Sequence, residues 1–299
     1  MAQIRLVGPR VSAMRAGELS SDDTNDGCHG NLDGVQPHDK AIISHVRVVV
    51  VCWGHFYQRT PSAFDNAVAL CKDIVTGPYF NGLAQYGVGR GSIAGAGTID
   101  DSTPPKTLSE DEARDKLLGF LDTLPDRPAV NDTSLLYILF LPPETKPTIS
   151  TGGDDFCGYH NWAKFNSESQ DSDLFYAIIR TDGADRSSGE AFIKSVSYCV
   201  SHEIAEAVSS RDGRGYFLGA CEISDLCEQT GTHNYPSPSS LTAGGWDVEQ
   251  YWSEWDHNCV NGEDPISVRR FLQAVQSPGD LRALHTPVLN IEYIASRFR

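Results

Sequence analysis

Residues 46–54 read VRVVVVCWG, and this run decides the fold class. Its apolar side chains follow one another without polar alternation, which is typical of a strand buried on both faces of a sheet. Beyond Pro61 the apolar residues recur at helical spacing and stop at Gly77-Pro78, a pair that ends helices. A buried strand followed by such a helix predicts an α/β or α+β protein.

The same alternation continues through the middle of the chain. A helix is expected at 108–124, where Ser109 stands in the N-cap position and acidic residues fill the first turn. The segment 157–162, CGYHNW, is polar and is expected to be a loop. Further strands are expected at 87–97, 134–143 and 173–181.

Composition limits the kinds of partner. The chain carries 24 Lys and Arg against 40 Asp and Glu, a net charge of −16, and has no basic stripe to meet phosphates. No run approaches the roughly 18 apolar residues of a membrane span. Neither nucleic acid nor a membrane is therefore an expected partner. The first 27 residues lack the apolar segment of a secretory signal, which favours a cytoplasmic location.

The chain divides into three expected regions. Residues 1–44 are poor in large apolar side chains, so an extended or disordered arm is expected there. A folded domain is expected at 45–260, and 261–299 are expected to add C-terminal helices. The eight cysteines are spread thinly, and their spacing leaves two alternatives open. Cys221 and Cys227 bridge the loop between them, or the thiols are free and buried.

The candidate chemistry lies in SYCVSHEIAEAVSS, residues 197–210. It contains His202-Glu203-x-x-Glu206, one residue short of the His-Glu-x-x-His signature of zinc hydrolases. On a helix, the large apolar residues gather on one face, which must be core: Ile193, Val196, Val200, Ile204 and Ala207. Small residues surround the histidine and the second glutamate on the opposite face, which predicts the floor of a cleft: Ser195, Cys199, His202, Glu206 and Ser209.

The spacing suits a metal ion. His202 and Glu206 lie one helical turn apart on the same side, so both can reach one ion. Glu203 lies about 100° round the helix, where a general base for a bound water belongs. The alternative is a histidine and a glutamate that only pair across one turn. A third ligand is expected from Glu222 or Asp225, which follow the helix in CEISDLCE.

Three further residues are candidates for the site. His160 follows Gly158-Tyr159, and either a contact with substrate or a fourth metal ligand is expected of it. Tyr159 or His160 is the expected group that stabilises an oxyanion. His55 stands at the end of the first buried strand, where α/β folds place binding groups, although a polar side chain there more often satisfies local hydrogen bonds.

Four segments occur in an order that resembles the EXORDIUM-like, phosphate-induced protein family of plants and its bacterial and fungal relatives. They are VVVVCWGHF (48–56), GYHNW (158–162), HEIAE (202–206) and EISDLC (222–227). The resemblance covers residues 46–260 and implies a relative of the zincin metallopeptidases. Such a domain has a mixed sheet with an active-site helix below its edge strand. The plant family is secreted, in contrast to the location expected above.

The resemblance also implies roles for individual residues. His202 and Glu206 would be ligands, Glu203 the general base, and Asp225 or Glu222 the remaining ligand. A metal-dependent hydrolase of peptide or amide bonds is therefore the expected function, with zinc as cofactor. A set of one histidine and two carboxylates would also suit manganese or iron.

Two other functions remain open. One is a metal-dependent lyase, isomerase or cyclase that binds a small molecule in an apolar pocket formed by the aromatic residues Trp246, Tyr251, Trp252 and Trp255. Such clusters are more often part of the core. The other is a binding protein whose metal is structural.

Overall fold

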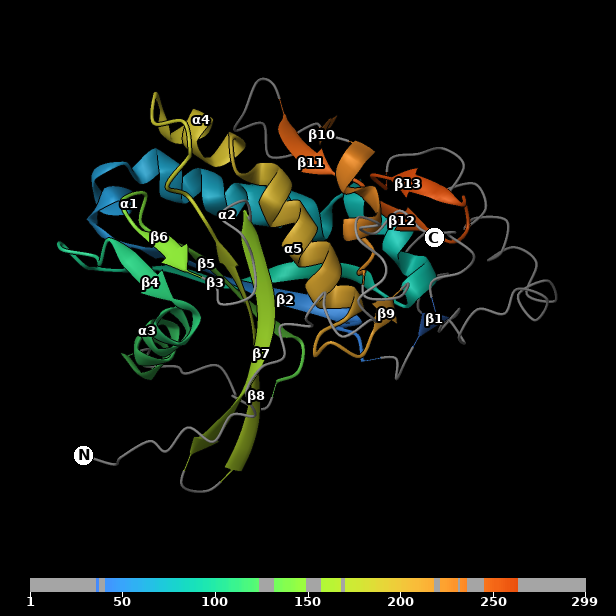
Figure 1. Cartoon of the computed structure of the whole chain (residues 1–299), viewed down its shortest axis with the longest axis horizontal. Coiled ribbons are helices and arrows are strands. Elements are labelled where there is room, and N and C mark those ends of the chain that lie inside the picture. The colour runs from blue at the N-terminus through green and yellow to red at the C-terminus, as the bar shows by residue number, and fades with distance from the viewer. Residues whose placement is uncertain are drawn as a thin grey trace, which may run out of the picture.

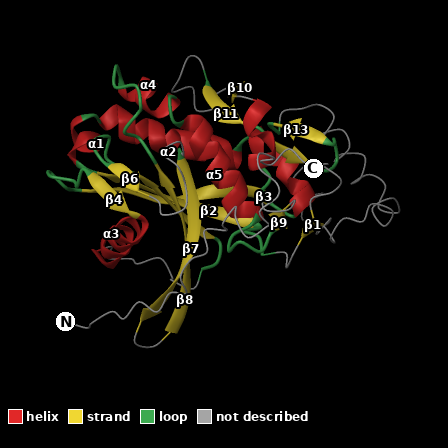
Figure 2. Ribbon diagram, viewed as in Figure 1, coloured by secondary structure: helices red, strands yellow, loops and turns green. Residues whose placement is uncertain are grey.

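The computed structural model describes residues 36–37, 41–123, 132–148, 157–167, 170–217, 221–230, 232–235 and 245–262. A five-stranded mixed sheet lies at its centre, and helices pack on both faces (Figure 1, Figure 2). The mixed α/β content agrees with the fold class predicted from the sequence. In spatial order the strands are β3 (Gly89–Ile99), β2 (His45–Trp53), β5 (Leu135–Phe140), β8 (Gln170–Ile179) and β7 (Gly158–Ser167).

Strand β2 is central because both faces of it are covered. It pairs in parallel with β3 and with β5. Val48 and Val50 belong to the core on one face of the sheet, and Val49 and Val51 belong to the core on the other. All four side chains are buried, so the prediction of a strand buried on both faces is confirmed.

Helices cover the two faces of the sheet unequally. Helix α3 (Glu110–Thr123) packs on the face of Val49. Ser109 stands directly before this helix in the predicted N-cap position. Its backbone N–H donates to Oε2 of Glu112 (2.8 Å), and the N–H of Glu112 donates to Oγ of Ser109 (3.3 Å). Five elements pack on the face of Val48: α1 (His55–Arg59), α2 (Pro61–Thr76), the 3-10 helix η1 (Pro78–Tyr86), α4 (Gly189–Lys194) and α5 (Ser197–Ser209).

The segment expected to be a loop at 157–162 is instead the beginning of β7. This strand runs antiparallel to β8 at the edge of the sheet, with His160 opposite Ala177. The prediction of a loop was wrong because polarity was the only signal used. An edge strand whose side chains contact polar groups does not need the apolar run of a central strand.

Short strand pairs and one 3-10 helix complete the described structure. The 3-10 helix η2 (Asp225–Thr230) follows the turn that carries Glu222. The pairs are β1 (Gln36–Pro37) with β9 (Tyr216–Phe217), β4 (Thr107–Ser109) with β6 (Lys146–Thr148), β10 (Thr232–Tyr235) with β11 (Trp246–Glu249), and β12 (Tyr251–Ser253) with β13 (Asn258–Val260).

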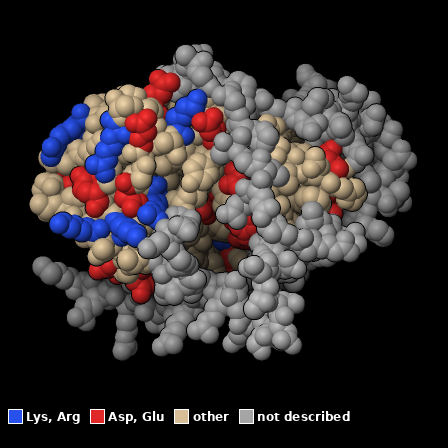
Figure 3. All heavy atoms as spheres, turned by 45° about the horizontal axis from the view of Figure 1, so that its top comes forward, with Lys and Arg blue, Asp and Glu red and all other residues tan. Residues whose placement is uncertain are grey.

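The boundaries of the folded region can be compared with the three expected regions. Most of the expected arm, 1–44, and most of the expected C-terminal helices, 261–299, lie outside the described residues. Ile43 is buried in the core, and its N–H donates to the carbonyl of Val208 (2.8 Å), so residues 41–44 pack with the domain. No described helix combines the length and the apolarity that crossing a membrane requires. On the face drawn in Figure 3, basic and acidic side chains are interspersed.

Disulfides tie distant elements together. Cys157 is bonded to Cys199 and Cys227 to Cys259, and Cys221 is disulfide-bonded as well. A Cys221–Cys227 bridge is therefore wrong, because Cys227 pairs with a strand 32 residues away instead of across its own loop. Among the cysteines that the structure describes, Cys52 and Cys71 are free and buried.

Candidate metal centre

Helix α5 is buried on more sides than its sequence predicts. Its apolar residues Val200, Ile204 and Ala207 are core, as expected. Ile193, which lies on α4, and Val196, which precedes α5, are core as well. The opposite face is also covered, since Cys199, Glu206 and Ser209 are buried. Strand β7 and strand β11 both pack against this helix. Its polar side chains therefore face other polar groups of the protein.

Three side chains converge beside the middle of α5. Nε2 of His202 lies 3.1 Å from Oε2 of Glu206 and 3.7 Å from Oδ1 of Asp225. Two ligand atoms that each lie about 2.1 Å from one tetrahedral ion are about 3.4 Å apart. The two measured distances bracket that value, so His202, Glu206 and Asp225 fit one ion.

The remaining polar atom of each of these side chains has a fixed partner. Nδ1 of His202 contacts Oε2 of Glu249 at 3.0 Å. Oε1 of Glu206 accepts a hydrogen bond from the backbone N–H of Asp225 at 3.1 Å. Oδ2 of Asp225 accepts one from the backbone N–H of Glu222 at 3.0 Å. Such outer contacts orient metal ligands, and here they turn one atom of each side chain toward a common point.

His160 enters the same cluster from β7. Its Nδ1 lies 3.1 Å from Oε2 of Glu203 and 3.8 Å from Oε2 of Glu206. Its Nε2 lies 3.2 Å from Oε2 of Glu222. His160, Glu206 and Glu222 form a second group with ligand atoms close enough for one ion. Glu222 and Asp225, which the sequence offered as alternatives, thus both belong to the cluster, beside different histidines.

Tyr159 and His55 lie apart from these groups. Adjacent residues of a strand point to opposite faces, so Tyr159 leaves β7 on the side away from His160. It packs against the core that contains α3, and burial raises the pKa of its hydroxyl. His55 begins α1, where its backbone N–H donates to the carbonyl of Asp101. Neither side chain belongs to a candidate ligand group of the described residues.

Three of the four aromatic residues of the expected pocket belong to the core, whereas Trp255 is partly exposed. Trp246, Tyr251 and Trp252 are buried. The indole N–H of Trp246 donates to Asp73, and the hydroxyl of Tyr251 donates to the carbonyl of Tyr79. Their packing gives no support to an aromatic substrate pocket.

Negative charge dominates the cluster. It contains five carboxylates and two imidazoles, and within the described residues no Lys or Arg forms an ion pair with it. Burial alone would lower the pKa of His202, but Glu206 and Glu249 outweigh it and hold that pKa well above its usual value. Glu222 and Glu203 likewise raise the pKa of His160 against its burial. Burial, aided by Asp225, raises the pKa of Glu206. Without a cation, protons must therefore neutralise the cluster.

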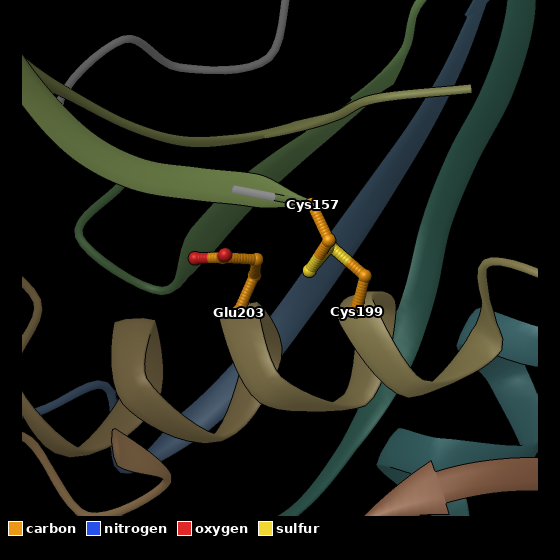
Figure 4. A group of neighbouring side chains, drawn as sticks. All are labelled: Cys157, Cys199 and Glu203. Atoms are coloured by element: carbon orange, nitrogen blue, oxygen red, sulfur yellow. A yellow bond between two sulfur atoms is a disulfide. The ribbon is translucent and has the colours of Figure 1, made fainter. Parts of the chain in front are cut away.

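A close approach of β7 to α5 brings the two histidines into one cluster. A Cβ on Gly158 would lie 2.7 Å from Sγ of Cys199 and 3.1 Å from Oε1 of Glu203, so only glycine fits without displacement. The Cys157–Cys199 disulfide crosses the same gap (Figure 4). Figure 4 also shows the Glu203 carboxylate turned away from the sulfur atoms. While the disulfide is intact, these sulfurs cannot serve as thiolate ligands.

Glu249 is the site residue that the sequence interpretation missed. It lies on β11 and is buried, 47 residues from the histidine that it contacts. Its backbone N–H donates to Oγ of Ser201 (2.9 Å), which fixes β11 beside α5. The one available signal was an acidic residue at the end of the run WDVE, in which Trp246 and Val248 have the alternation of a buried strand.

Comparisons of the chain with protein-family models, with curated proteins and with solved structures find no match. The function is therefore inferred from the side chains of the cluster.

Proposed function

We propose that the protein is a metal-dependent hydrolase of zincin type, in which His202, Glu206 and Asp225 hold a divalent cation. Zinc is the expected ion, with manganese and iron as alternatives. The observation that carries the proposal is the fixed partner on the other polar atom of each ligand, which leaves Nε2, Oε2 and Oδ1 directed at one point. A histidine and a carboxylate that only paired across a helical turn would not need these partners.

The sheet supports the comparison with zincins. Four strands are parallel, and β7 is an antiparallel strand at the edge. Helix α5 packs against β7 and carries His202 and Glu206. The resemblance implies a mixed sheet with the active-site helix below its edge strand, and this arrangement is compatible with it.

The chain's own residues can divide the work of hydrolysis. A cation in the site would polarise a substrate carbonyl and lower the pKa of water. Glu203 is the proton acceptor, because its carboxylate is buried beside the ligands and hydrogen-bonded to His160. His160, which carries a raised pKa, is the group that stabilises negative charge on the carbonyl oxygen.

The edge strand favours an extended peptide as substrate. Within the described residues β7 pairs with β8 alone, so its other side can accept a peptide as an added strand. A peptide bound in that way would run past His160, next to the proposed ligands. A small molecule without a peptide backbone could not form this strand pairing.

Hydrolysis by protein stripped of metal and then reloaded tests the proposal. Mixed fluorogenic peptides are the probe, with zinc, manganese and iron added separately. We expect Glu203→Gln to retain the metal but to lose about 10²–10⁴-fold in rate, the usual contribution of a general base. His202→Ala should lose the activity together with the ion that His202, Glu206 and Asp225 hold. The matched control is His257→Asn, which changes an exposed histidine with a positive φ of 48° that asparagine tolerates.

Two results would contradict the proposal. Equal rates for wild type and Glu203→Gln would remove Glu203 from the chemistry. Bound metal without hydrolysis of any peptide or amide would favour a binding protein with a structural metal.

A further inference from the structure

The cluster contains two groups of candidate ligands that share one carboxylate. One group is His202, Glu206 and Asp225, and the other is His160, Glu206 and Glu222. The two imidazoles fall in different groups. A single ion bound to one group would therefore leave the histidine of the other group unbound to metal. We infer that the centre holds two divalent cations bridged by Glu206. This inference rests on the proposed function and adds a second ion to it.

The two histidines are held in the same way. Nδ1 of His202 contacts a carboxylate oxygen of Glu249 at 3.0 Å, and Nδ1 of His160 contacts one of Glu203 at 3.1 Å. Nε2 of His202 lies 3.1 Å from Glu206, and Nε2 of His160 lies 3.2 Å from Glu222. A carboxylate on the outer nitrogen is the usual companion of a metal-binding histidine. Both imidazoles therefore have the surroundings of a ligand.

The bridging atom is Oε2 of Glu206. It lies 3.1 Å from Nε2 of His202 and 3.8 Å from the imidazole of His160, measured to Nδ1, the nitrogen that Glu203 holds. The ligand atoms of His160, Glu206 and Glu222 lie within 4.8 Å of one another, so Glu206 belongs to both groups. Bonds of about 2.1 Å from one oxygen to two ions allow the ions to lie about 3.5–4 Å apart, the separation typical of two-metal sites. Oε1 of the same carboxylate stays with the backbone N–H of Asp225.

The charge of the cluster also favours two cations. Metal-binding histidines are neutral. Five ionised carboxylates with one divalent cation would leave a net charge of −3, and a second cation reduces it to −1. The carboxylate side chains of Glu203, Glu206 and Glu249 are at most 8% exposed, so water screens this charge poorly.

Glu222 gives an independent indication of a ligand at the second position. Its Oε1 is buried and accepts no hydrogen bond of good geometry in the described part of the chain, although the nearby Ser210 hydroxyl helps to lower the pKa of this carboxyl. A buried carboxylate oxygen that is satisfied this poorly can accept a further ligand. A cation beside Glu222 would satisfy it. His160 would then serve as a ligand, and a cation held by His160, Glu206 and Glu222 would supply the charge that stabilises the oxyanion.

Metal stoichiometry separates the possibilities. The full chain is stripped with chelator, loaded with Mn²⁺, passed through a desalting column and analysed for bound manganese. We expect two equivalents in the wild type, one in His160→Ala, one in His202→Ala and two in the control His257→Asn. Circular dichroism checks that each variant is folded. Electron paramagnetic resonance of the loaded wild type should show exchange coupling between two manganese ions, and His160→Ala should show isolated ions.

Each other outcome decides against the inference. One equivalent in the wild type, kept by His160→Ala and lost by His202→Ala, would leave the proposed hydrolase with a single ion. Two equivalents that both remain in His160→Ala would place the second ion elsewhere. Glu222→Gln provides a milder second variant if His160→Ala fails to fold, and loss of one equivalent is expected there too. No bound manganese in any variant would overturn both the inference and the proposed function.

Discussion

Gly158→Ala tests whether close contact between β7 and α5 builds the site. The added Cβ would lie 2.7 Å from Sγ of Cys199 and 2.9 Å from the carbonyl oxygen of Ile178, whereas ordinary contacts are about 3.5–4 Å. Strand β7 must therefore move by about 0.5–1 Å. Overpacking of this kind costs about 1–3 kcal/mol in the free energy of unfolding. His160, two residues along the strand, moves with it, so peptide hydrolysis should fall by up to about 10²-fold.

The matched control is Gly95→Ala on β3, at the opposite edge of the same sheet. A Cβ there has no neighbour within 4 Å. Because alanine restricts the unfolded chain, this change should be neutral or should stabilise by about 0.4–1 kcal/mol. Urea unfolding of both variants, with the disulfides intact, gives the comparison. Equal unfolding free energies for Gly158→Ala and Gly95→Ala would refute the packing argument.

Three further predictions address the ligands and the charges. Glu249→Gln should weaken metal binding by about 10–100-fold, because the outer partner of His202 is less basic; calorimetric titration checks this, and an unchanged affinity contradicts it. Metal affinity should rise at least about tenfold per pH unit from pH 6 to 8, because the cation displaces protons from the site histidines; a flat profile would show that none is displaced. Lys116 lowers the pKa of Asp101 through a 2.8 Å hydrogen bond. Asp101→Asn should therefore lower the free energy of unfolding by about 1 kcal/mol at pH 7. This difference should be present above pH 3.9, about the pKa of Asp101 in the unfolded chain, and should be lost as the pH falls through its lower pKa in the folded protein. A difference in unfolding free energy between wild type and Asp101→Asn that is as large at pH 3 as at pH 7 would contradict this prediction.

The central strand and the site helix could be predicted because local pattern determines them. The consecutive valines of β2 point to both faces of the sheet, so the strand is stable only where both faces are covered. His202 and Glu206 are one turn apart, so their proximity follows from helix geometry alone. Asp225 and Glu222 could be predicted as candidate ligands because the chain turns back soon after α5.

Other parts of the site depend on contacts between distant segments. Nothing in GYHNW indicates that His160 lies on an edge strand beside α5, because its polarity reflects the surroundings that tertiary packing supplies. Glu249 reaches His202 only once β11 is fixed by Ser201. The disulfide pairs could not be predicted either, since eight cysteines allow 105 complete pairings.

Anomalous diffraction from crystals grown with zinc shows directly whether His202 and Glu206 hold an ion. Data collected on both sides of the zinc absorption edge locate the ion without reference to activity. We expect an anomalous peak about 2.0–2.2 Å from Nε2 of His202 and from the nearest carboxylate oxygen of Glu206. An empty cluster at saturating zinc, or a peak only at surface histidines, would contradict the metal centre.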